Sequence, residues 1–426
     1  MARTLDFWFD YTCPYAYLGS TQAPSLAARM GVTLAYRPLL LGGVFRANDT
    51  PQKLFATQGA AKAAHNLADM QRWAKRFGVS LTMPPNHPMR SVEALRATLA
   101  TNIDPRVIDA FFRAYWVDNA DIGSREVVAK VLASCGHDPA RILDAIDTPA
   151  IKDDLRTRTD EAIALGIFGV PTWIIDGNLF WGQDRIAFVE GVSRVSPVPV
   201  PVPDPPLLSV FWDFSSPFGY LASTQVDALA ARTGARVTWH PVLLGGLFRA
   251  IGTPDVPIAT FSEAKRSYIM KDLDRWAAHL GVPLRFPSRF PVHSLRALRV
   301  YLALPEERRA AYREAVFRAC WADDRDITDD AVLASCIGDD ACATFGSACL
   351  VSHEAIAAEA LAKANADDVK TALRRSTEQA AEQGVFGVPT FVVSHAGAGD
   401  NELFWGQDRL DLVEEALSPG GRPRAR

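Results

Sequence analysis

Cys13 and Ser216 are the two side chains whose type and position point most directly to chemistry. Each follows an apolar run that ends at an aspartate, and each directly precedes a proline. Because proline is favoured in the first turn of a helix, we expect both residues at a helix N-terminus. Unpaired amide N–H groups and the helix dipole favour an anion there, so a thiol with an ordinary pKa of about 8.5 could be held as thiolate near neutral pH.

The residue three positions further on separates this pattern from a disulfide-exchange motif. Ala16 and Gly219 stand where a resolving cysteine would be needed, so classical disulfide exchange is not expected. Ser216 cannot be a redox centre, but its hydroxyl can donate a hydrogen bond to a thiolate that a bound cofactor supplies. The pattern therefore indicates that the thiol at the Ser216 site comes from a bound cofactor. At Cys13 two interpretations stay open, a reactive thiol at a helix start and an inert buried thiol.

Segments that lie far apart in the chain read alike, which indicates a tandem duplication. The segments around the two candidate residues match each other position by position, and the register holds without a gap as far as Arg96 and Arg299. Later blocks match at larger offsets, which predicts loop insertions in the second half. The matching pairs are 9–18 with 212–221, 38–51 with 241–254, 168–172 with 386–390, and 179–185 with 403–409.

Each half has the same predicted order of elements. A short strand (5–9; 209–212) precedes the helix that the proline opens, and a second strand (32–37; 236–240) follows. Apolar residues at helical spacing then predict a long all-helical insertion, and two β-branched runs around an Asp-Gly turn predict a final hairpin and a last helix. This order is that of a thioredoxin fold with an inserted helical subdomain. The sequence therefore predicts an α/β protein of two tandem thioredoxin-like domains.

The chain length of 426 residues exceeds what a single hydrophobic core supports, in agreement with two domains. We expect a first domain at 1–193, a proline-rich linker in polyproline II conformation at 194–206, a second domain at 207–418, and a disordered tail at 419–426. Since each half by itself has a complete domain pattern, we also expect the two halves to pack as an internal pseudo-dimer.

Composition narrows the class of protein. The chain is 48% hydrophobic and 22% charged with a formal net charge of -4, which is typical of a globular protein without bulk attraction for nucleic acid. The sequence shows neither an N-terminal apolar segment of the signal type nor a run of eighteen apolar residues, so we expect a cytoplasmic protein without a membrane span. Six cysteines without a Cys-x-x-Cys pair predict neither a disulfide framework nor a metal site.

Four blocks of the second half carry a resemblance to a known family. Residues 213–222 (DFSSPFGYLA), 241–250 (PVLLGGLFRA) and 384–393 (GVFGVPTFVV), together with 403–410 (LFWGQDRL), resemble 2-hydroxychromene-2-carboxylate isomerases. These enzymes are related to kappa-class glutathione transferases and DsbA-type proteins. The resemblance covers nearly all of both halves. It implies a glutathione-dependent isomerase in which the glutathione thiolate adds reversibly to a conjugated enone or hydroxychromene carboxylate.

The resemblance also implies roles for residues at matching positions. Ser216 would lie beside the glutathione sulfur, and Cys13 takes that position in the first half. The remaining implied glutathione-binding positions are the residues before and at two expected cis-prolines (Val170, Pro171, Val388, Pro389), the start of the last helix (Gln183, Asp184, Gln407, Asp408), two lysines (Lys62, Lys265), and two threonines that stand where relatives usually carry asparagine (Thr50, Thr253).

Structural readings of the same residues stay open. Lysines on a helix are usually solvated, and an aspartate in a first helical turn can serve only the helix dipole. Two other functions also stay open. One is a kappa-type glutathione transferase or peroxidase, which would consume the thiol. The other is a non-catalytic glutathione- or partner-binding module, because duplication frees one half to lose activity. A small-molecule substrate is expected in the two enzymatic cases.

Overall fold

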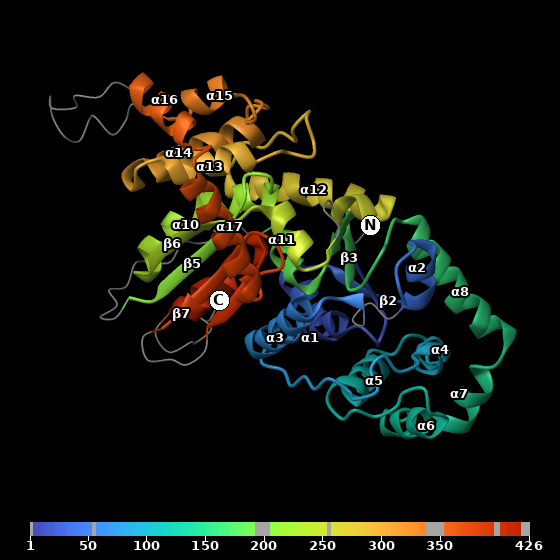
Figure 1. Cartoon of the computed structure of the whole chain (residues 1–426). Coiled ribbons are helices and arrows are strands. Elements are labelled where there is room, and N and C mark those ends of the chain that lie inside the picture. Colours follow the sequence, from blue (N-terminus) through green and yellow to red (C-terminus); the bar gives the residue numbers. More distant parts are fainter. Residues whose placement is uncertain are drawn as a thin grey trace. The chain divides into compact units, whose positions relative to one another are not determined.

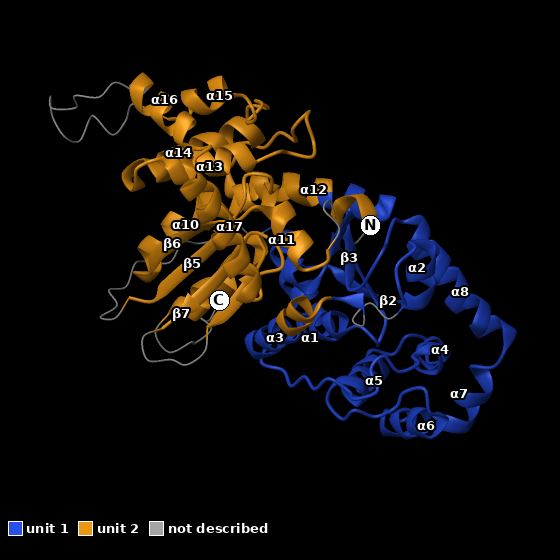
Figure 2. Ribbon diagram, in the orientation of Figure 1, with its two compact units in different colours: residues 1–58, 66–194, 261–269 blue, residues 59–65, 195–260, 270–426 orange. Residues whose placement is uncertain are grey.

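The computed structural model describes residues 3–52, 57–191, 205–253, 257–337, 353–395 and 401–418. It divides the chain into two compact units (Figure 2). Unit 1 comprises residues 1–58, 66–194 and 261–269, and unit 2 comprises 59–65, 195–260 and 270–426. Residues 194–204 of the expected linker and the tail 419–426 lie outside the described residues. The domain boundaries and the internal pseudo-dimer stay predictions.

A four-stranded mixed sheet forms the centre of unit 1, in the strand order β2-β1-β3-β4 (Figure 1). β1 pairs in parallel with β2 and antiparallel with β3, and β3 forms a hairpin with β4. The hairpin turns at Asp176 and Gly177, which both have positive φ, as the Asp-Gly sequence predicts. The strands are β1 (Thr4–Phe9), β2 (Thr33–Pro38), β3 (Thr172–Ile175) and β4 (Asn178–Trp181).

Helices complete unit 1, and those between β2 and β3 match the predicted helical insertion. Helix α1 begins at Pro14 and ends at Gly31, whose φ of 64° allows the left-handed cap. The helices are α1 (Pro14–Met30), α2 (Leu41–Ala47), α3 (Ala60–Phe77), α4 (Val92–Ala100), α5 (Pro105–Trp116), α6 (Arg125–Ser134), α7 (Pro139–Ala145), α8 (Pro149–Ala164) and α9 (Ile186–Glu190), with a 3-10 turn η2 (Gln183–Arg185). Residues 60–65 of α3 are grouped with unit 2, and residues 263–269 of α12 (Glu263–Leu280) are grouped with unit 1.

Unit 2 repeats this arrangement with the strand order β6-β5-β7-β8. Its strands are β5 (Leu207–Trp212), β6 (Arg236–Pro241), β7 (Thr390–Ser394) and β8 (Glu402–Trp405). Its helices are α10 (Pro217–Thr233), α11 (Leu244–Ala250), α12 (Glu263–Leu280), α13 (Leu295–Ala303), α14 (Glu306–Trp321), α15 (Asp330–Ser335), α16 (His353–Lys363), α17 (Asp367–Glu382) and α18 (Leu410–Leu417), with 3-10 turns η3 (Pro257–Thr260) and η5 (Gln407–Arg409). The predicted fold class, two thioredoxin-like α/β domains with helical insertions, is confirmed.

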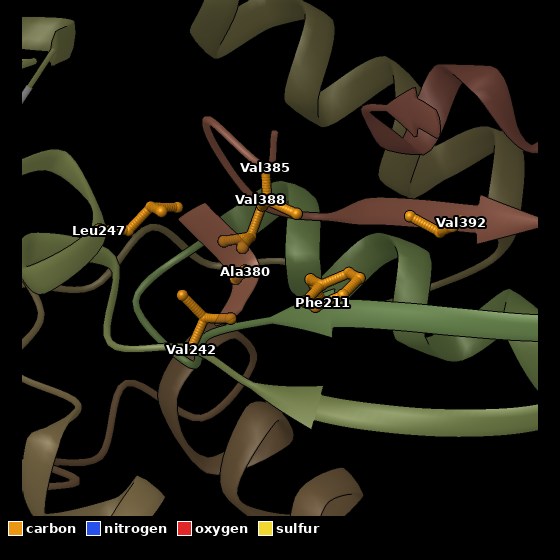
Figure 3. Packing of buried hydrophobic residues seen from close by; sticks show 7 residues of the cluster. All are labelled: Phe211, Val242, Leu247, Ala380, Val385, Val388 and Val392. Atoms are coloured by element: carbon orange, nitrogen blue, oxygen red, sulfur yellow. The ribbon is translucent and has the colours of Figure 1, made fainter. Parts of the chain in front are cut away.

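The core of unit 2 connects the sheet to the loop before β7. Seven apolar side chains pack together there (Figure 3): Phe211, Val242, Leu247, Ala380, Val385, Val388 and Val392. They come from β5, the end of β6, α11, α17 and β7 with its preceding loop. Since burying each such side chain contributes about 1.5–3 kcal/mol, this cluster fixes the loop at Val388 against the sheet.

A buried tryptophan joins the helical insertion of unit 2 to the end of β5. Trp321, the last residue of α14, is fully buried, and its Nε1 donates a hydrogen bond of 2.7 Å to the carbonyl oxygen of Phe214. In unit 1, Trp116 makes the same bond of 2.7 Å to Tyr11. The insertion therefore holds the loop that leads from the first strand into the first helix.

We expect Trp321→Phe to lower the free energy of unfolding more than Trp212→Phe does. Both tryptophans are buried, but Nε1 of Trp212 has no hydrogen-bond partner in the described part of the chain, so its replacement removes bulk alone. Losing the Trp321 bond leaves a buried carbonyl unpaired, at a cost of about 1–3 kcal/mol. Urea unfolding followed by circular dichroism measures the difference. Equal destabilisation by the two variants would contradict the anchoring role.

Candidate functional site

Ser216 is the N-cap residue of α10 and lies at the centre of the candidate site in unit 2. Its backbone is extended, with φ -102° and ψ 118°, and its side chain is only 4% exposed. Oγ accepts a hydrogen bond of 3.0 Å from the amide of Gly219 and donates one of 3.1 Å to the carbonyl oxygen of Val388. The hydroxyl is therefore polarised by the helix N-terminus while it contacts the loop before β7.

The expected cis-prolines are present in both units. Val170–Pro171 and Val388–Pro389 are cis peptide bonds, and the carbonyl before each proline faces the helix start at Cys13 or Ser216. This prediction is confirmed. Two further cis bonds, His87–Pro88 and Phe290–Pro291, were not predicted from the sequence. They occupy equivalent places in the two insertions.

Cys13 occupies the equivalent position in unit 1, but its state differs from the expectation. Its Sγ donates a hydrogen bond of 3.0 Å to the carbonyl oxygen of Val170, and the side chain makes no cap bond to α1. Burial raises the pKa of the Cys13 thiol to about 12, although the amides of Ala16 and Tyr15 act in the opposite direction. At this thiol desolvation outweighs the helix N-terminus, which disfavours a thiolate near neutral pH. The structure favours the buried, unreactive thiol.

A buried carboxylate holds each helix start in place. In unit 2, Asp213 accepts hydrogen bonds from the amide of Ser215 at 3.0 Å, from the amide of Leu244 at 2.7 Å and from the hydroxyl of Ser294. One side chain therefore joins the end of β5, the loop before Ser216, the start of α11 and the start of α13. Burial raises the pKa of Asp213, while these hydrogen bonds lower it.

Unit 1 has the same bridge at Asp10. This carboxylate accepts bonds from the amide of Thr12 at 3.0 Å, from its hydroxyl at 3.1 Å and from the amide of Leu41 at 2.8 Å, and Ser91 also donates to it. The sequence placed an aspartate at the end of each first strand but assigned it no role. The signal that could have found it is its recurrence with a serine, at the same spacing, in both repeats.

The residues expected at the start of the last helix lie in short 3-10 turns. Gly182 precedes Gln183 with a φ of 110°, a conformation that glycine adopts readily, and a Cβ there would collide with Asp184 Oδ1. Asp184 pairs with Arg185 at 3.0 Å. Gln183 is 3% exposed, and its Nε2 has no hydrogen-bond partner among the described residues, so a buried amide donor is available for a ligand.

Unit 2 repeats this turn. Gly406 has a φ of 104°, Gln407 is buried, and Asp408 pairs with Arg409 at 3.2 Å.

The two threonines expected to bind a ligand, Thr50 and Thr253, make local contacts instead. The amide of Thr50 donates to Phe45 at 2.9 Å and that of Thr253 donates to Phe248 at 2.9 Å, so each closes the turn after α2 or α11. Their predicted ligand role stays a prediction.

The two lysines contact the tryptophans that end the hairpins. Lys62, which belongs to unit 2, has its Nζ 5.5 Å from the ring centroid of Trp405. Lys265, which belongs to unit 1, has its Nζ 5.8 Å from the ring of Trp181 and 3.9 Å from that of Phe261. Sequence reasoning named both lysines without the tryptophans, and it predicted Trp181 and Trp405 only as hairpin core.

Sheet order, cis-proline and a polar or thiol residue at the facing helix start together define a thioredoxin-fold protein. The model of the DSBA-like thioredoxin domain matches residues 4–192 and again residues 207–418. The chain therefore belongs to the DSBA-like thioredoxin domain family and carries this domain twice.

Each of the following curated relatives is similar to about half of this chain. The 2-hydroxychromene-2-carboxylate isomerase of Sphingobium xenophagum is 28% identical over 200 residues, which cover 45% of this chain and 97% of the relative. The enzyme of the same name from Pseudomonas putida is 30% identical and covers 50% and 94%. Human glutathione S-transferase kappa 1 is 27% identical and covers 47% and 96%. The relatives are thus isomerases and transferases of a thiol-related enzyme family.

In the parts of the chain that the structure describes, no helix combines the length and the apolar character that a membrane crossing requires.

We expect Cys13 to resist alkylation. With a pKa of about 12, its thiolate fraction at pH 8 is on the order of 10³ below that of a free thiol, and the side chain is buried as well. Iodoacetamide labelling followed by peptide mass spectrometry measures the rate, with the partly exposed Cys135 as internal control. The Cys13 rate should rise about tenfold per pH unit through pH 10. A labelling midpoint below pH 8 would show a stabilised thiolate instead.

We expect Asp213→Asn to destabilise unit 2 by about 1–3 kcal/mol, because an amide NH2 group cannot accept from the second backbone N–H. The folded-state pKa of Asp213 is raised, so the folded state binds more protons than the unfolded state above pH 3.8, and this contribution to stability falls as pH rises. The gap between parent and variant should therefore be largest near pH 4 and narrow toward neutral pH.

Urea unfolding across this pH range measures that gap. Asp274→Asn, at an exposed position of α12 in unit 2, is the control and should leave the unfolding midpoint nearly unchanged. A gap that widens as pH rises would show that the buried carboxyl is stabilised as an anion.

Proposed function

We propose that unit 2 is a glutathione-dependent isomerase that acts on a conjugated aromatic enone or a hydroxychromene carboxylate. The observation that carries this proposal is the Ser216 hydroxyl, which is capped by the Gly219 amide, faces the carbonyl of Val388, and has no cysteine in the first turn of its helix. Similarity to isomerases along nearly their whole length supports the substrate class.

The residues at the site fit glutathione. Lys62 offers a half-buried ammonium group in unit 2, and at the equivalent turn of unit 1 Gln183 offers a buried amide donor that has no partner among the described residues. Val170 and Val388 would pair their backbone with the tripeptide, Gln183, Asp184, Gln407 and Asp408 would hold its γ-glutamyl end, and Lys62, Lys265, Thr50 and Thr253 complete the proposed contacts. Bound glutathione would supply a thiolate that adds reversibly to the enone, so that a double bond becomes a rotatable single bond.

The chain's own residues stabilise and orient the reactants. A hydroxyl rotates freely, so Ser216 can turn its O–H from Val388 toward the sulfur while Oγ still accepts from Gly219. The Ser216 hydroxyl, polarised by the Gly219 amide at the positive end of α10, then stabilises negative charge. Asp213 keeps this loop in position, which orients the hydroxyl before the substrate arrives.

Kappa-type transfer or peroxide reduction is the second candidate, favoured by the similarity to human glutathione S-transferase kappa 1. It would use the same site but consume glutathione, so quantifying glutathione after turnover distinguishes the two reactions.

For unit 1 we propose a non-catalytic role, because its thiol is buried with a pKa of about 12. Cys13, Cys135, Cys320 and Cys336 are free thiols, which supports a cytoplasmic location. A place in the breakdown of aromatic compounds is proposed from the similarity to 2-hydroxychromene-2-carboxylate isomerases alone.

We expect Ser216→Ala to lower glutathione-dependent turnover of 2-hydroxychromene-2-carboxylate by a factor on the order of 10²–10³, since one donor to the developing anion is lost. Cys13→Ser should leave turnover unchanged or raise it, because the thiol lies in unit 1 and contacts Val170. Steady-state kinetics on the full chain measures both. Loss of turnover in Cys13→Ser with Ser216→Ala unaffected would show that the roles of the units are reversed.

A further inference from the structure

Strand β2 lies at one edge of the sheet in unit 1 and pairs with β1 on its inner side. The amides of Thr33 and Leu39 donate hydrogen bonds of 3.0 Å toward the β1 side. Because backbone groups alternate between the two sides of a strand, Leu34 and Tyr36 direct their N–H and C=O groups outward. In the described part of the chain these outward groups have no backbone partner, so the edge can accept a further strand.

A groove of about 710 Å³ lies along this edge. Residues 34–37 of β2 line it, so side chains from both faces of the strand contribute. Ala27 and Ala28 line it from α1, and Ile103 lines it from the segment before α5. All of its lining residues belong to unit 1. An extended chain in this groove would reach the outward N–H and C=O groups of β2 and bury apolar side chains against α1.

The equivalent edge of unit 2 is covered. There β6 is the edge strand, and the guanidinium group of Arg313 lies over Trp239 of this strand, 3.6 Å from the ring centroid. Arg313 is only 2% exposed, and the charge of Asp227 on α10 acts on it. Unit 1 has Ile108 and Pro24 at the matching positions of its sequence. Since charged residues on an edge strand prevent unwanted pairing, unit 2 protects the edge that unit 1 leaves open.

The charge of the groove favours an acidic ligand. Arg37 and Arg158 are the only charged side chains among the described residues that line it. Arg37 donates to Asp6 and Arg158 donates to Asp154, each through Nε at 2.9 Å. Because these bonds leave the Nη groups unused, both guanidinium groups keep donors for another carboxylate. A ligand that carries a carboxylate beside apolar side chains therefore complements the groove.

We propose that the β2 edge of unit 1 binds an extended peptide segment of another protein. This segment joins the sheet as an additional strand, pairs with the backbone of Leu34 and Tyr36, and places a carboxylate at Arg37 and Arg158. In this mode of recognition main-chain hydrogen bonds provide affinity, and the side chains around the edge provide specificity. Such binding is independent of glutathione, and it gives unit 1, for which we propose no catalysis, a function as a docking domain.

Fluorescence anisotropy on the full chain tests this binding with a defined probe. The probe is a fluorescein-labelled hexapeptide in which valine alternates with glutamate, and we expect a saturable rise in its anisotropy. N-methylation of alternate peptide amides removes the hydrogen bonds along one edge of the probe and leaves the protein unaltered. At least one of the two methylated probes should bind about tenfold more weakly, because an added strand pairs with β2 through its backbone.

Ala28→Glu and Ala231→Glu are a matched pair of variants. Both alanines are exposed and hold the same position in α1 and α10, but Ala28 lines the groove. Ala28→Glu should weaken probe binding about tenfold, because its side chain fills the groove and repels the carboxylates of the probe, and Ala231→Glu should leave binding unchanged. Arg158→Gln should weaken the glutamate probe but not a probe with glutamine in its place. Circular dichroism checks that each variant is folded.

Four outcomes would overturn the proposal. The first is a parent chain that does not bind the glutamate probe, or that binds it only as tightly as the glutamine probe. The second is full binding of both methylated probes, which excludes pairing with a strand edge. The third is equal weakening by Ala28→Glu and Ala231→Glu, which places the peptide outside the groove. The fourth is dimerisation in sedimentation velocity that Ala28→Glu abolishes, which makes a second copy of the chain the occupant.

Discussion

Both units depend on a buried carboxylate at the end of the first strand. Asp213 accepts hydrogen bonds from backbone amides of two separate loops and from a hydroxyl of the insertion, and Asp10 does the same in unit 1. Without this acceptor, the backbone N–H groups at these loops would be buried and unpaired, which costs more than an ordinary hydrogen bond contributes. The position of the helix start, and with it the direction of the Ser216 hydroxyl, follows from this bridge.

Duplication preserved the framework and changed the reactive residue. In unit 2 the hydroxyl of Ser216 both accepts a hydrogen bond from α10 and donates one to Val388, whereas in unit 1 the Cys13 thiol donates to the carbonyl of Val170 without a cap bond to α1. Sulfur is a weaker hydrogen-bond partner than oxygen, so the helix start stabilises it less against the cost of burial. The same geometry therefore produces a polarised hydroxyl in one copy and a protonated thiol in the other.

Features set by local sequence were predicted well. The Asp-Gly turn at 176–177, the proline-initiated helices and the cis bonds at Pro171 and Pro389 depend on a few adjacent residues or on matching motifs. The raised pKa of Cys13 could not be predicted, because desolvation depends on side chains distant in sequence that cover the thiol. The contact of Lys62 with Trp405 was missed for the same reason, since the two residues lie in different repeats.

The sequence by itself determined the duplication, the order of strands and helices, and the residue types at each helix start, because repeats, hydrophobic periodicity and turn residues are local properties. Tertiary structure decided which groups meet. It brought Asp213 to the amide of Leu244, made Cys13 a buried thiol, and packed His65 and Lys62 into the unit that contains Ser216. Burial and contact between distant segments set charge and hydrogen bonding, and neither is encoded at any single position.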